Sequence, residues 1–348
     1  MDFIRKNIRR INYYLALAKA NSYYAKEALT PSSLVNKHVY FELDQIDYHR
    51  YFYVLVIFYR RAEYTVFIKA SKKSIARIIR DKYAQKLLLD NQVIFVKSVQ
   101  SDDFSKINFV QLTPSYFENT TTLKYHIPMC QHPTMYDQGI DNLQFEPKRY
   151  NSLGFAGDFR VHLYGKSELK ESFEHLNRIE MFAELEQTNR VVHLSSNHNQ
   201  NFKEHLVYII DNASVHLEPK DYRMFISQFD FFLALPGIHM PLSHNIIETM
   251  SLGTIPFVHK SYAKHMHPPL EHMKTAFIYD DFRSLNASIS SLFQIEDSMI
   301  EAMRKEVLAY YNKYLTPSAV IQNIEKHKGS EIALNAEWNS INLDSETT

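Results

Sequence analysis

The strongest constraint on the fold is a strand–helix–strand pattern between residues 229 and 257. Residues 229–235 form a continuous apolar run, which is typical of a parallel strand covered on both faces. A polar loop follows, then one short helix that ends at Gly253, and then a buried strand opened by Ile255 and Pro256. This order places a helix N-terminus, with its free N–H groups and partial positive charge, beside the sheet. Such a helix end is a natural phosphate-binding site.

The same helix carries one acidic residue, Glu248, about one turn after its start. A carboxylate there can accept hydrogen bonds from the hydroxyls of a ribose or a sugar. Ser243 stands where the helix N-cap is expected, and a cap can also donate to a phosphate. Phosphate and polyol together describe a nucleotide-sugar, so we expect this segment to bind one.

The second half of the chain repeats this alternation. Strands are expected at residues 153–157, 190–194, 214–217, 229–235, 255–257 and 275–279, and helices at 168–186, 204–210, 219–228, 244–252, 282–293 and 296–315. Alternating strands and helices predict an α/β fold with a parallel, doubly wound sheet. Ligands of such sheets bind at the carboxyl ends of the strands.

The first half is less regular. A helix is expected at residues 3–19, strands at 51–58, 64–69 and 93–96, and a helix at 74–89. Loops dominate from 102 to 148, where several prolines fall. Because 348 residues suit two domains, we expect an N-terminal domain over 1–150, a ligand-binding domain over 151–330 and a polar tail over 331–348.

Charge and cysteine content restrict the partners. Lys+Arg and Asp+Glu are both 39, which argues against nucleic acid as the main partner. The single cysteine excludes an internal disulfide and suits a reducing compartment. The chain shows neither a membrane-spanning apolar run nor the apolar core of a signal peptide. These features predict a cytoplasmic protein.

The N-terminal helix has two interpretations. Ile4, Ile8, Ile11 and Leu15 recur at helical spacing, and basic residues occupy its other faces. A basic amphipathic helix can lie on an anionic membrane, here the inner membrane face. Alternatively, residues 3–19 pack against their own domain. The sequence leaves both open.

Glycine is scarce and concentrated. None of the seven glycines precedes Gly139, and five fall between Gly154 and Gly253. Glycine-bearing turns after strands are where α/β proteins bind phosphates. Taken singly, each glycine also fits a simple turn or helix cap; their clustering places the nucleotide end of the site in the second half.

Residues 150–295 resemble the nucleotide-sugar domain of GT-B glycosyltransferases, and most closely the exostosin-like branch. In that branch a Ser-x-Arg-x-x-Glu-Ala helix leads through a glycine to an Ile-Pro-Val strand. The corresponding residues here are Ser243, His244, Asn245 and Glu248, followed by Gly253 and residues 255–257. Residues 153–157 resemble the strand that opens this domain, and Arg160 and Lys166 follow it at the place of diphosphate-binding cations.

The resemblance implies a two-domain, Rossmann-like GT-B fold and a glycosyltransferase. The implied partners are a nucleotide-sugar donor, which is a co-substrate rather than a cofactor, and a glycan or glycolipid acceptor bound by the N-terminal domain. An unanchored cytoplasmic enzyme with a basic N-terminal helix suits surface-polysaccharide synthesis. The donor-binding residues implied are Gly157, Arg160, Lys166, Ser243, His244, Asn245 and Glu248.

Three departures from the family pattern affect the chemistry. Asn245 replaces the exostosin arginine, which removes a fixed charge and a bidentate phosphate partner. Met240 stands where retaining enzymes commonly carry a second glutamate. The chain also lacks Asp-x-Asp, the usual Mn²⁺ or Mg²⁺ ligand pair of the other main glycosyltransferase fold. We therefore expect a metal-independent mechanism, in which cations and helix dipoles stabilise the leaving diphosphate.

An inverting transferase also needs a base to deprotonate the acceptor hydroxyl. We expect it from the N-terminal domain, and choose His132 and Asp137 from the polar, aromatic segment 125–137. Asp44, Asp47 and His49 are rivals.

Other readings stay open. Histidines 239, 244, 265, 267 and 272 invite a zinc site, but their spacing and irregular loop argue against one. The alternative functions are a non-catalytic nucleotide- or carbohydrate-binding relative and a sugar-nucleotide epimerase on the same fold.

Overall fold

The computed structural model describes residues 2–24, 37–43, 50–97, 108–113, 124–127, 130–165, 177–195, 201–238, 242–280 and 285–335. They group into two compact units. Unit 1 comprises Met1–Ile127 and Pro317–Ser340, and unit 2 comprises Pro128–Thr316 and Ile341–Thr348. The sequence placed the boundary near residue 150. In the structure residues 128–150 belong with unit 2, and the chain returns to unit 1 after Thr316.

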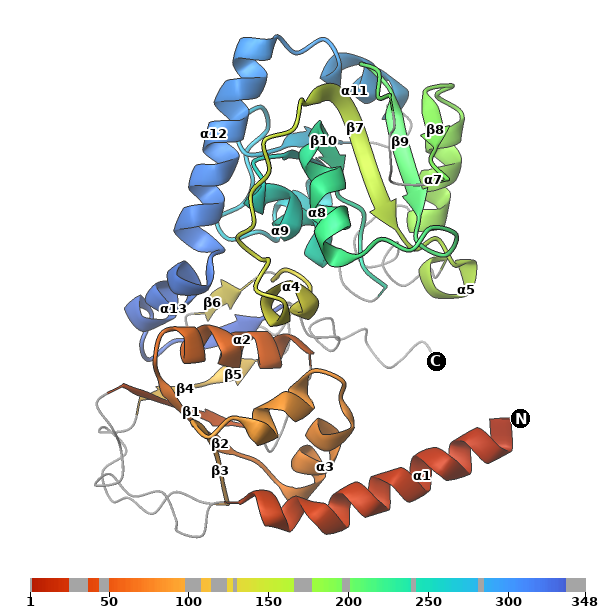
Figure 1. Ribbon diagram of the computed structural model, residues 1–348. Helices are drawn as coiled ribbons and strands as arrows, with labels where there is room; N and C mark the ends of the chain where they lie inside the picture. The colour runs from red at the N-terminus through yellow and green to blue at the C-terminus, as the bar shows by residue number, and fades with distance from the viewer. Residues whose placement is uncertain are drawn as a thin grey trace. The chain divides into compact units, whose positions relative to one another are not determined.

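Unit 2 is built on a six-stranded parallel sheet in the order β12-β11-β10-β7-β9-β8 (Figure 1). Its strands are β7 (Tyr150–Gly157), β8 (Val191–His193), β9 (Val207–Asp211), β10 (Phe229–Leu233), β11 (Ile255–His259) and β12 (Phe277–Tyr279). The strands β9 and β8 lie on one side of β7, and β10, β11 and β12 follow in order on its other side, so the strand order reverses between β7 and β10. Ligands of doubly wound sheets bind at such a reversal.

Helices precede, connect and follow these strands. They are α4 (Pro133–Asp137), α5 (Val161–Tyr164), α7 (Arg178–Glu186), α8 (Pro219–Ser227), α9 (His244–Ser251), α10 (Lys260–Ala263), α11 (Leu285–Leu292) and α12 (Asp297–Tyr314). The helix α8 packs on β7 and β10 and contacts α9, which in turn contacts α12, while α7 contacts α11. In Figure 1 the arrowheads of β7 and β9 point to α5, which marks the carboxyl edge of the sheet.

Unit 1 contains two smaller parallel sheets. One has the order β3-β2-β1-β4, formed by β1 (His38–Glu42), β2 (Thr65–Lys69), β3 (Val93–Val96) and β4 (Phe109–Val110). The other has the order β5-β13-β6, formed by β5 (Leu112–Thr113), β6 (Lys124–Ile127) and β13 (Glu331–Leu334). Its helices are α1 (Asp2–Lys19), α2 (Arg50–Arg61), α3 (Lys72–Arg80) and α13 (Pro317–Lys326), with 3₁₀ turns η1 (Ala20–Tyr23) and η3 (Ala84–Leu89).

The predicted fold class is confirmed: two α/β units, each with parallel strands, and the doubly wound sheet in the C-terminal half. None of the helices in the described ranges combines the length and apolarity needed to cross a bilayer.

The strand predicted at residues 51–58 is wrong. This segment is α2, a helix buried on nearly every side from Tyr51 to Tyr59. A helix that is apolar all round has no polar face, so its sequence lacks the 3.6-residue alternation that marks an amphipathic helix. Aromatic and β-branched residues then favour a strand on composition alone.

Two further predictions in unit 2 are wrong. Residues 204–210 were expected to be a helix, but Val207–Asp211 is strand β9, which pairs with both β7 and β8. Residues 214–217 were expected to be a strand, but they follow a turn capped by Asp211. Its carboxylate accepts hydrogen bonds from the Ala213 N–H at 3.0 Å and from the Ser214 hydroxyl at 3.4 Å. This capping ends the chain's extended course immediately after β9.

The chain also departs from prediction at three further places. The helix expected at 74–89 breaks at Asp81, whose carboxylate accepts the N–H groups of Tyr83 and Ala84. The polar tail expected over 331–348 begins with β13, whose residues Ile332, Ala333 and Leu334 are buried. The loops expected over 102–148 contain β4, β5, β6 and α4.

Candidate active site

The helix α9 begins at the carboxyl edge of the unit 2 sheet. Because β10 and β11 are parallel, the helix that joins them must start at the edge where β10 ends. Gly253, with φ of +66°, ends α9. The Gly253 N–H bonds to the Met250 carbonyl and the Thr254 N–H to the Thr249 carbonyl, the pattern of a Schellman motif. The chain thus turns directly into β11, as the sequence predicts.

Glu248 is fully buried on α9 and both of its carboxylate oxygens are bound. Oε1 accepts the backbone N–H of His132 at 2.9 Å, and Oε2 lies 3.1 Å from Nδ1 of His244. Burial and the charge of this carboxylate raise the pKa of the nearby Tyr222 hydroxyl well above its ordinary value. Burial alone would raise the pKa of Glu248, but the charge and hydrogen bond of His244 and the His132 N–H lower it to about 2. The carboxylate is therefore ionised at neutral pH.

The helix α4 brings His132 to this cluster. His132 is the N-cap of α4, and its Nδ1 accepts the Thr134 N–H at 3.3 Å. Its ring meets the His244 ring edge to face, with centroids 5.1 Å apart. His132 was predicted in the N-terminal domain, whereas the structure places it in unit 2 together with Glu248. Two segments 116 residues apart in the chain therefore form one site.

Nδ1 of each of the two histidine rings has a hydrogen-bond partner. In His132 the bond from Thr134 occupies Nδ1, so the proton of the neutral ring lies on Nε2. In His244 the carboxylate of Glu248 occupies Nδ1, so Nε2 is the nitrogen left for a ligand. The side chain of His244 is 37% exposed. His244 is thus the accessible member of a Glu–His pair.

Two buried polar atoms on α9 have no hydrogen-bond partner among the residues that the structure describes. They are Oδ1 of Asn245 and Oγ1 of Thr249. Their residues are 4% and 0% exposed, respectively. Ser243 is the N-cap by position, but its hydroxyl makes no capping hydrogen bond. Unmet hydrogen-bonding capacity of this kind is costly in a protein interior and calls for a function.

A buried arginine links the segments that carry this cluster. Arg223 of α8 donates to Oε1 of Gln131 at 2.8 Å, to Oγ of Ser251 at 3.1 Å and to the Leu143 carbonyl at 2.8 Å. Gln131, next to His132 in the chain, also donates to the hydroxyl of Tyr311 at 2.8 Å. This network fixes α4 against α8 and α9. The sequence gives no signal for it, because its members are up to 180 residues apart.

Arg178 is a second buried cation that sequence reasoning missed. It donates to the Asp158 carbonyl at 3.0 Å, just after β7, and to the Pro236 carbonyl at 2.6 Å, just after β10. Its guanidinium lies 3.9 Å from the centre of the Tyr164 ring. Arg178 therefore sits at the carboxyl ends of β7 and β10, where the strand order reverses. Asn177 and Glu180 form a capping box, a sequence signal that places Arg178 at the first position of α7.

The residues after β7 that the sequence predicts to bind the donor are less suited to that role. Arg160 is exposed and forms an ion pair with Asp158, whose charge offsets its own. A Cβ on Gly157 would lie 2.6 Å from the Phe155 ring, so this glycine makes room for an aromatic side chain. Gly154 does the same for Phe229. Lys166 lies outside the described residues.

Asp137 is exposed at the last position of α4, five residues beyond His132. Its assignment as a base stays a prediction. The rivals Asp44, Asp47 and His49 lie outside the described residues, as does Met240. Across the described ranges no three His, Cys, Asp or Glu side chains come together as a metal site would require.

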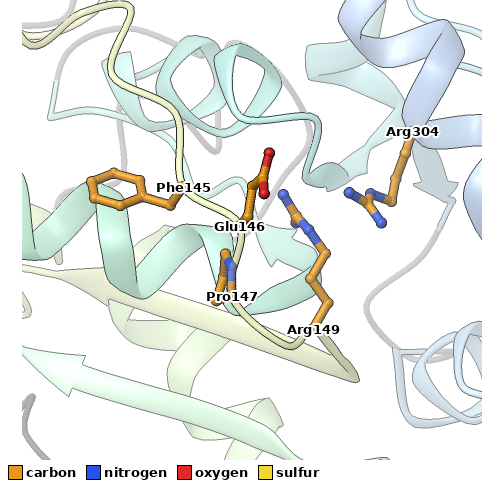
Figure 2. A pocket seen from close by; sticks show the side chains of 5 residues that line it. All are labelled: Phe145, Glu146, Pro147, Arg149 and Arg304. Atoms are coloured by element: carbon orange, nitrogen blue, oxygen red, sulfur yellow. The ribbon is translucent and has the colours of Figure 1, made fainter.

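Unit 2 also has a pocket at the opposite, amino edge of the sheet (Figure 2). It has a volume of about 310 Å³ and is lined by Phe145, Glu146, Pro147, Arg149 and Arg304. Arg149 donates to the Phe229 carbonyl and to the Leu252 carbonyl, which ties together the starts of neighbouring strands. The pocket therefore accompanies a structural arginine and lies away from α9's N-terminus.

Comparison with known proteins gives similarity of fold alone. No family model and no curated protein matches the chain. One similar structure is that of HepE of Anabaena in complex with UDP-glucose. Its sequence identity to this chain is 10% and its TM-score is 0.41, and the match covers 83% of this chain and 98% of HepE. An α-glucosyltransferase in complex with UDP and a 13-mer DNA containing an A:G mismatch is 11% identical with a TM-score of 0.43, covering 84% and 99%. Phage T4 β-glucosyltransferase is 11% identical with a TM-score of 0.36, covering 84% and 75%. Any assignment of activity to this chain must therefore rest on its own site.

Proposed function

We propose that the chain is a GT-B glycosyltransferase of the exostosin-like kind, which moves a sugar from a nucleotide-sugar to a glycan or glycolipid without a metal. One observation carries the proposal. A buried, ionised carboxylate, Glu248, holds His244 at the first turn of α9, at the carboxyl edge of a doubly wound sheet. Such an arrangement has little purpose in a helix that serves only as packing, because burying a charge is costly.

The donor diphosphate is proposed to bind at the start of α9. The partial positive charge of the helix N-terminus, Nε2 of His244 and the hydroxyl of Ser243 would all face it. Charge develops on the diphosphate as the glycosidic bond breaks, so these groups lower the barrier directly. Oδ1 of Asn245, which lacks a partner, is an acceptor for a hydroxyl of the donor.

Glu248 takes a different role from the one expected from sequence. Its two oxygens are occupied by the His132 N–H and by His244. We therefore assign it as the positioning residue that orients His244, rather than as a direct ligand of the sugar. Arg178 is proposed to add positive potential at the ends of β7 and β10, a role that the sequence assigned to Arg160 and Lys166.

The residue that deprotonates the acceptor hydroxyl is also proposed. With Nδ1 of His132 engaged by Thr134, its Nε2–H is a donor, which suits contact with the donor substrate better than proton abstraction. Asp137, an exposed carboxylate on the same helix, is then the better candidate for deprotonating the acceptor. Surface-polysaccharide synthesis is the proposed setting, since a glycan or glycolipid is the proposed acceptor.

A non-catalytic nucleotide-binding relative is the second candidate. The pairing of Arg160 with Asp158 favours it, because a predicted diphosphate cation is already neutralised. Asn245 in place of the family's arginine points the same way.

The test combines binding and turnover. Purified protein is screened by thermal shift against UDP-, GDP-, CMP- and ADP-sugars, and donor hydrolysis is followed for each one that binds. His244→Ala and Glu248→Gln are expected to weaken donor binding and to lower kcat/KM by about 10²-fold. His193→Ala is the matched control, since His193 forms an exposed pair with Glu186 on the edge strand β8.

The outcomes separate the candidates. Binding with no turnover of any donor identifies the non-catalytic relative, and isomerisation of the donor without an acceptor identifies an epimerase. If no nucleotide-sugar shifts the melting temperature, or if His244→Ala and His193→Ala behave alike, the site assignment is wrong.

A further inference from the structure

The helix α1 exposes an apolar stripe to solvent. Ile8, Ile11 and Leu15 are 51%, 58% and 64% exposed. Their spacing of three and four residues places them on one face of the helix. Tyr14, beside this stripe, is 55% exposed. Large apolar side chains gathered on one helix face mark an interaction surface, whereas scattered ones do not.

The opposite face of α1 already has a partner. Ala16 and Ala20, at the C-terminal end of α1 and in the turn that follows, are buried, and α1 packs against α3. The guanidinium of Arg80, from α3, lies 5.6 Å from the centre of the Tyr13 ring. The helix is therefore held to unit 1 by one face, and its apolar stripe is not needed for that packing. This removes the simpler interpretation, in which the stripe packs on its own domain.

Positive charge lies on the other faces of α1 and on α3, which packs against it. The helix α1 carries five basic residues and one acid, and the adjacent α3 carries four basic residues and no acid. The chain as a whole has a net charge of zero, with 39 basic and 39 acidic residues. Arg9 and Arg10 on α1, and Lys72, Lys73 and Arg80 on α3, are exposed. Basic charge is thus concentrated on the pair of helices that also presents the apolar stripe.

We propose that α1 forms a docking surface for an anionic phospholipid bilayer, with Ile8, Ile11 and Leu15 inserted at the headgroup boundary. An amphipathic helix lies in the plane of the headgroups when one face is apolar and its polar face is rich in Lys and Arg. Charge complementarity selects a lipid surface over an apolar groove of another protein, because anionic headgroups attract each Lys and Arg near the surface. This proposal is independent of the glycosyltransferase activity.

The test is co-sedimentation of the full chain with vesicles of phosphatidylcholine alone and with about 30% phosphatidylglycerol added. Binding is expected only to the anionic vesicles and is expected to fall when the NaCl concentration rises to about 0.5 M. Ile11→Glu is expected to weaken binding by about tenfold, because a charge replaces a buried apolar group. Ile11→Phe is expected to bind like the wild type.

Two controls keep the result interpretable. Met299→Glu changes an exposed methionine of α12, which is 44% exposed and belongs to unit 2, and is expected to leave binding unchanged. Circular dichroism and thermal unfolding establish that each variant is folded. A folded Ile11→Glu protein that binds as well as the wild type overturns the proposal. So does a wild type that ignores anionic vesicles, or a dimer in light scattering that Ile11→Glu converts to monomer, since a second copy would then cover the stripe.

Discussion

Single residues in unit 2 show how burial and neighbours compete for a carboxylate. Glu248 on α9 and Asp230 on the central strand β10 are both buried. The pKa of Glu248 falls to about 2, because two histidines and a backbone N–H outweigh burial. The pKa of Asp230 rises to about 6, because burial outweighs the attraction of Arg304 and Arg149. Glu248 stays charged throughout the physiological pH range. Asp230 instead gains or loses its proton near the lower end of that range.

Asp230 therefore makes stability depend on pH. Its folded pKa exceeds its unfolded value of 3.8, so the folded state binds the proton more tightly. The contribution is fully present below pH 4 and is lost as pH rises through 6. Asp230→Asn removes this loss, and its free energy of unfolding relative to wild type should rise by about 1–3 kcal/mol between pH 4 and pH 7.5. Urea unfolding at the two pH values measures the change.

Glu146→Gln is the matched control for Asp230→Asn. Glu146 is an exposed carboxylate at the pocket that Arg149 and Arg304 also line. Its removal should change the free energy of unfolding by no more than about 0.5 kcal/mol at either pH. An Asp230→Asn protein whose advantage over wild type is the same at pH 4 and pH 7.5 would show that Asp230 is not the titrating group.

At the scale of elements, the end of α9 depends on one backbone conformation. Gly253 has φ of +66°, and an added Cβ would meet Leu308 of α12 at 3.0 Å. Gly139 shares that φ of +66° but has open space around it. Gly139→Ala should cost about 1 kcal/mol through the left-handed backbone alone. Gly253→Ala should cost more, by about 1 kcal/mol, because it also overpacks α12. Chemical denaturation of both variants measures the difference.

The comparison of these two glycines isolates packing from backbone strain. Equal destabilisation of the two variants would mean that Leu308 moves aside freely, and that α12 does not constrain the end of α9. A larger cost at Gly139 than at Gly253 would contradict the assignment of φ at one of them.

Whether an element can be predicted from the sequence depends on how many of its faces are buried. Buried parallel strands such as β7, β10 and β11 are short apolar runs with clear ends, and helices such as α8 and α12 have one apolar face. Both patterns are visible locally. The helix α2 is buried on nearly all sides, so its period is hidden, and β9 was missed because charged Glu204 and polar His205 precede it.

The residues of the candidate site also differ in how far the sequence can predict them. Ser243, His244, Asn245 and Glu248 lie on one continuous segment, so local pattern reveals them. His132 was chosen from a polar loop, but its partnership with Glu248 spans 116 residues. Arg223 and Gln131 are buried polar residues joined across 92 residues. Contacts of that range are set by the tertiary fold and leave no mark in a local sequence pattern.

For the whole molecule, unit 1 is discontinuous in sequence. The strand β13 lies between β5 and β6 and pairs with both. A chain ending at Thr316 lacks β13 and α13, so β5 and β6 lose their common partner. Hydrogen exchange measured by mass spectrometry should then rise sharply over residues 112–113 and 124–127. Exchange over β7, β9 and β10 of unit 2 should stay slow, since their sheet contains no residue beyond 279.

The full-length protein, measured under the same conditions, is the reference for that truncation. Unchanged protection of β6 in the shortened chain would mean that β13 is not needed to hold that strand. A loss of protection that spread to β10 would instead mean that the two units unfold together.

The central position of β13 also bears on how the protein is made. A ribosome releases the chain from its N-terminus, so β5 and β6 emerge about 200 residues before the strand that must lie between them. Unit 2 can complete its sheet in that interval. In unit 1, the backbone groups of β5 and β6 lack their partner until β13 has been made. Nascent chains of this protein should therefore depend on holding chaperones until residues 331–334 have been translated, and a stop codon only slightly before residue 331 should be as harmful to the β5-β13-β6 sheet as one just after residue 316.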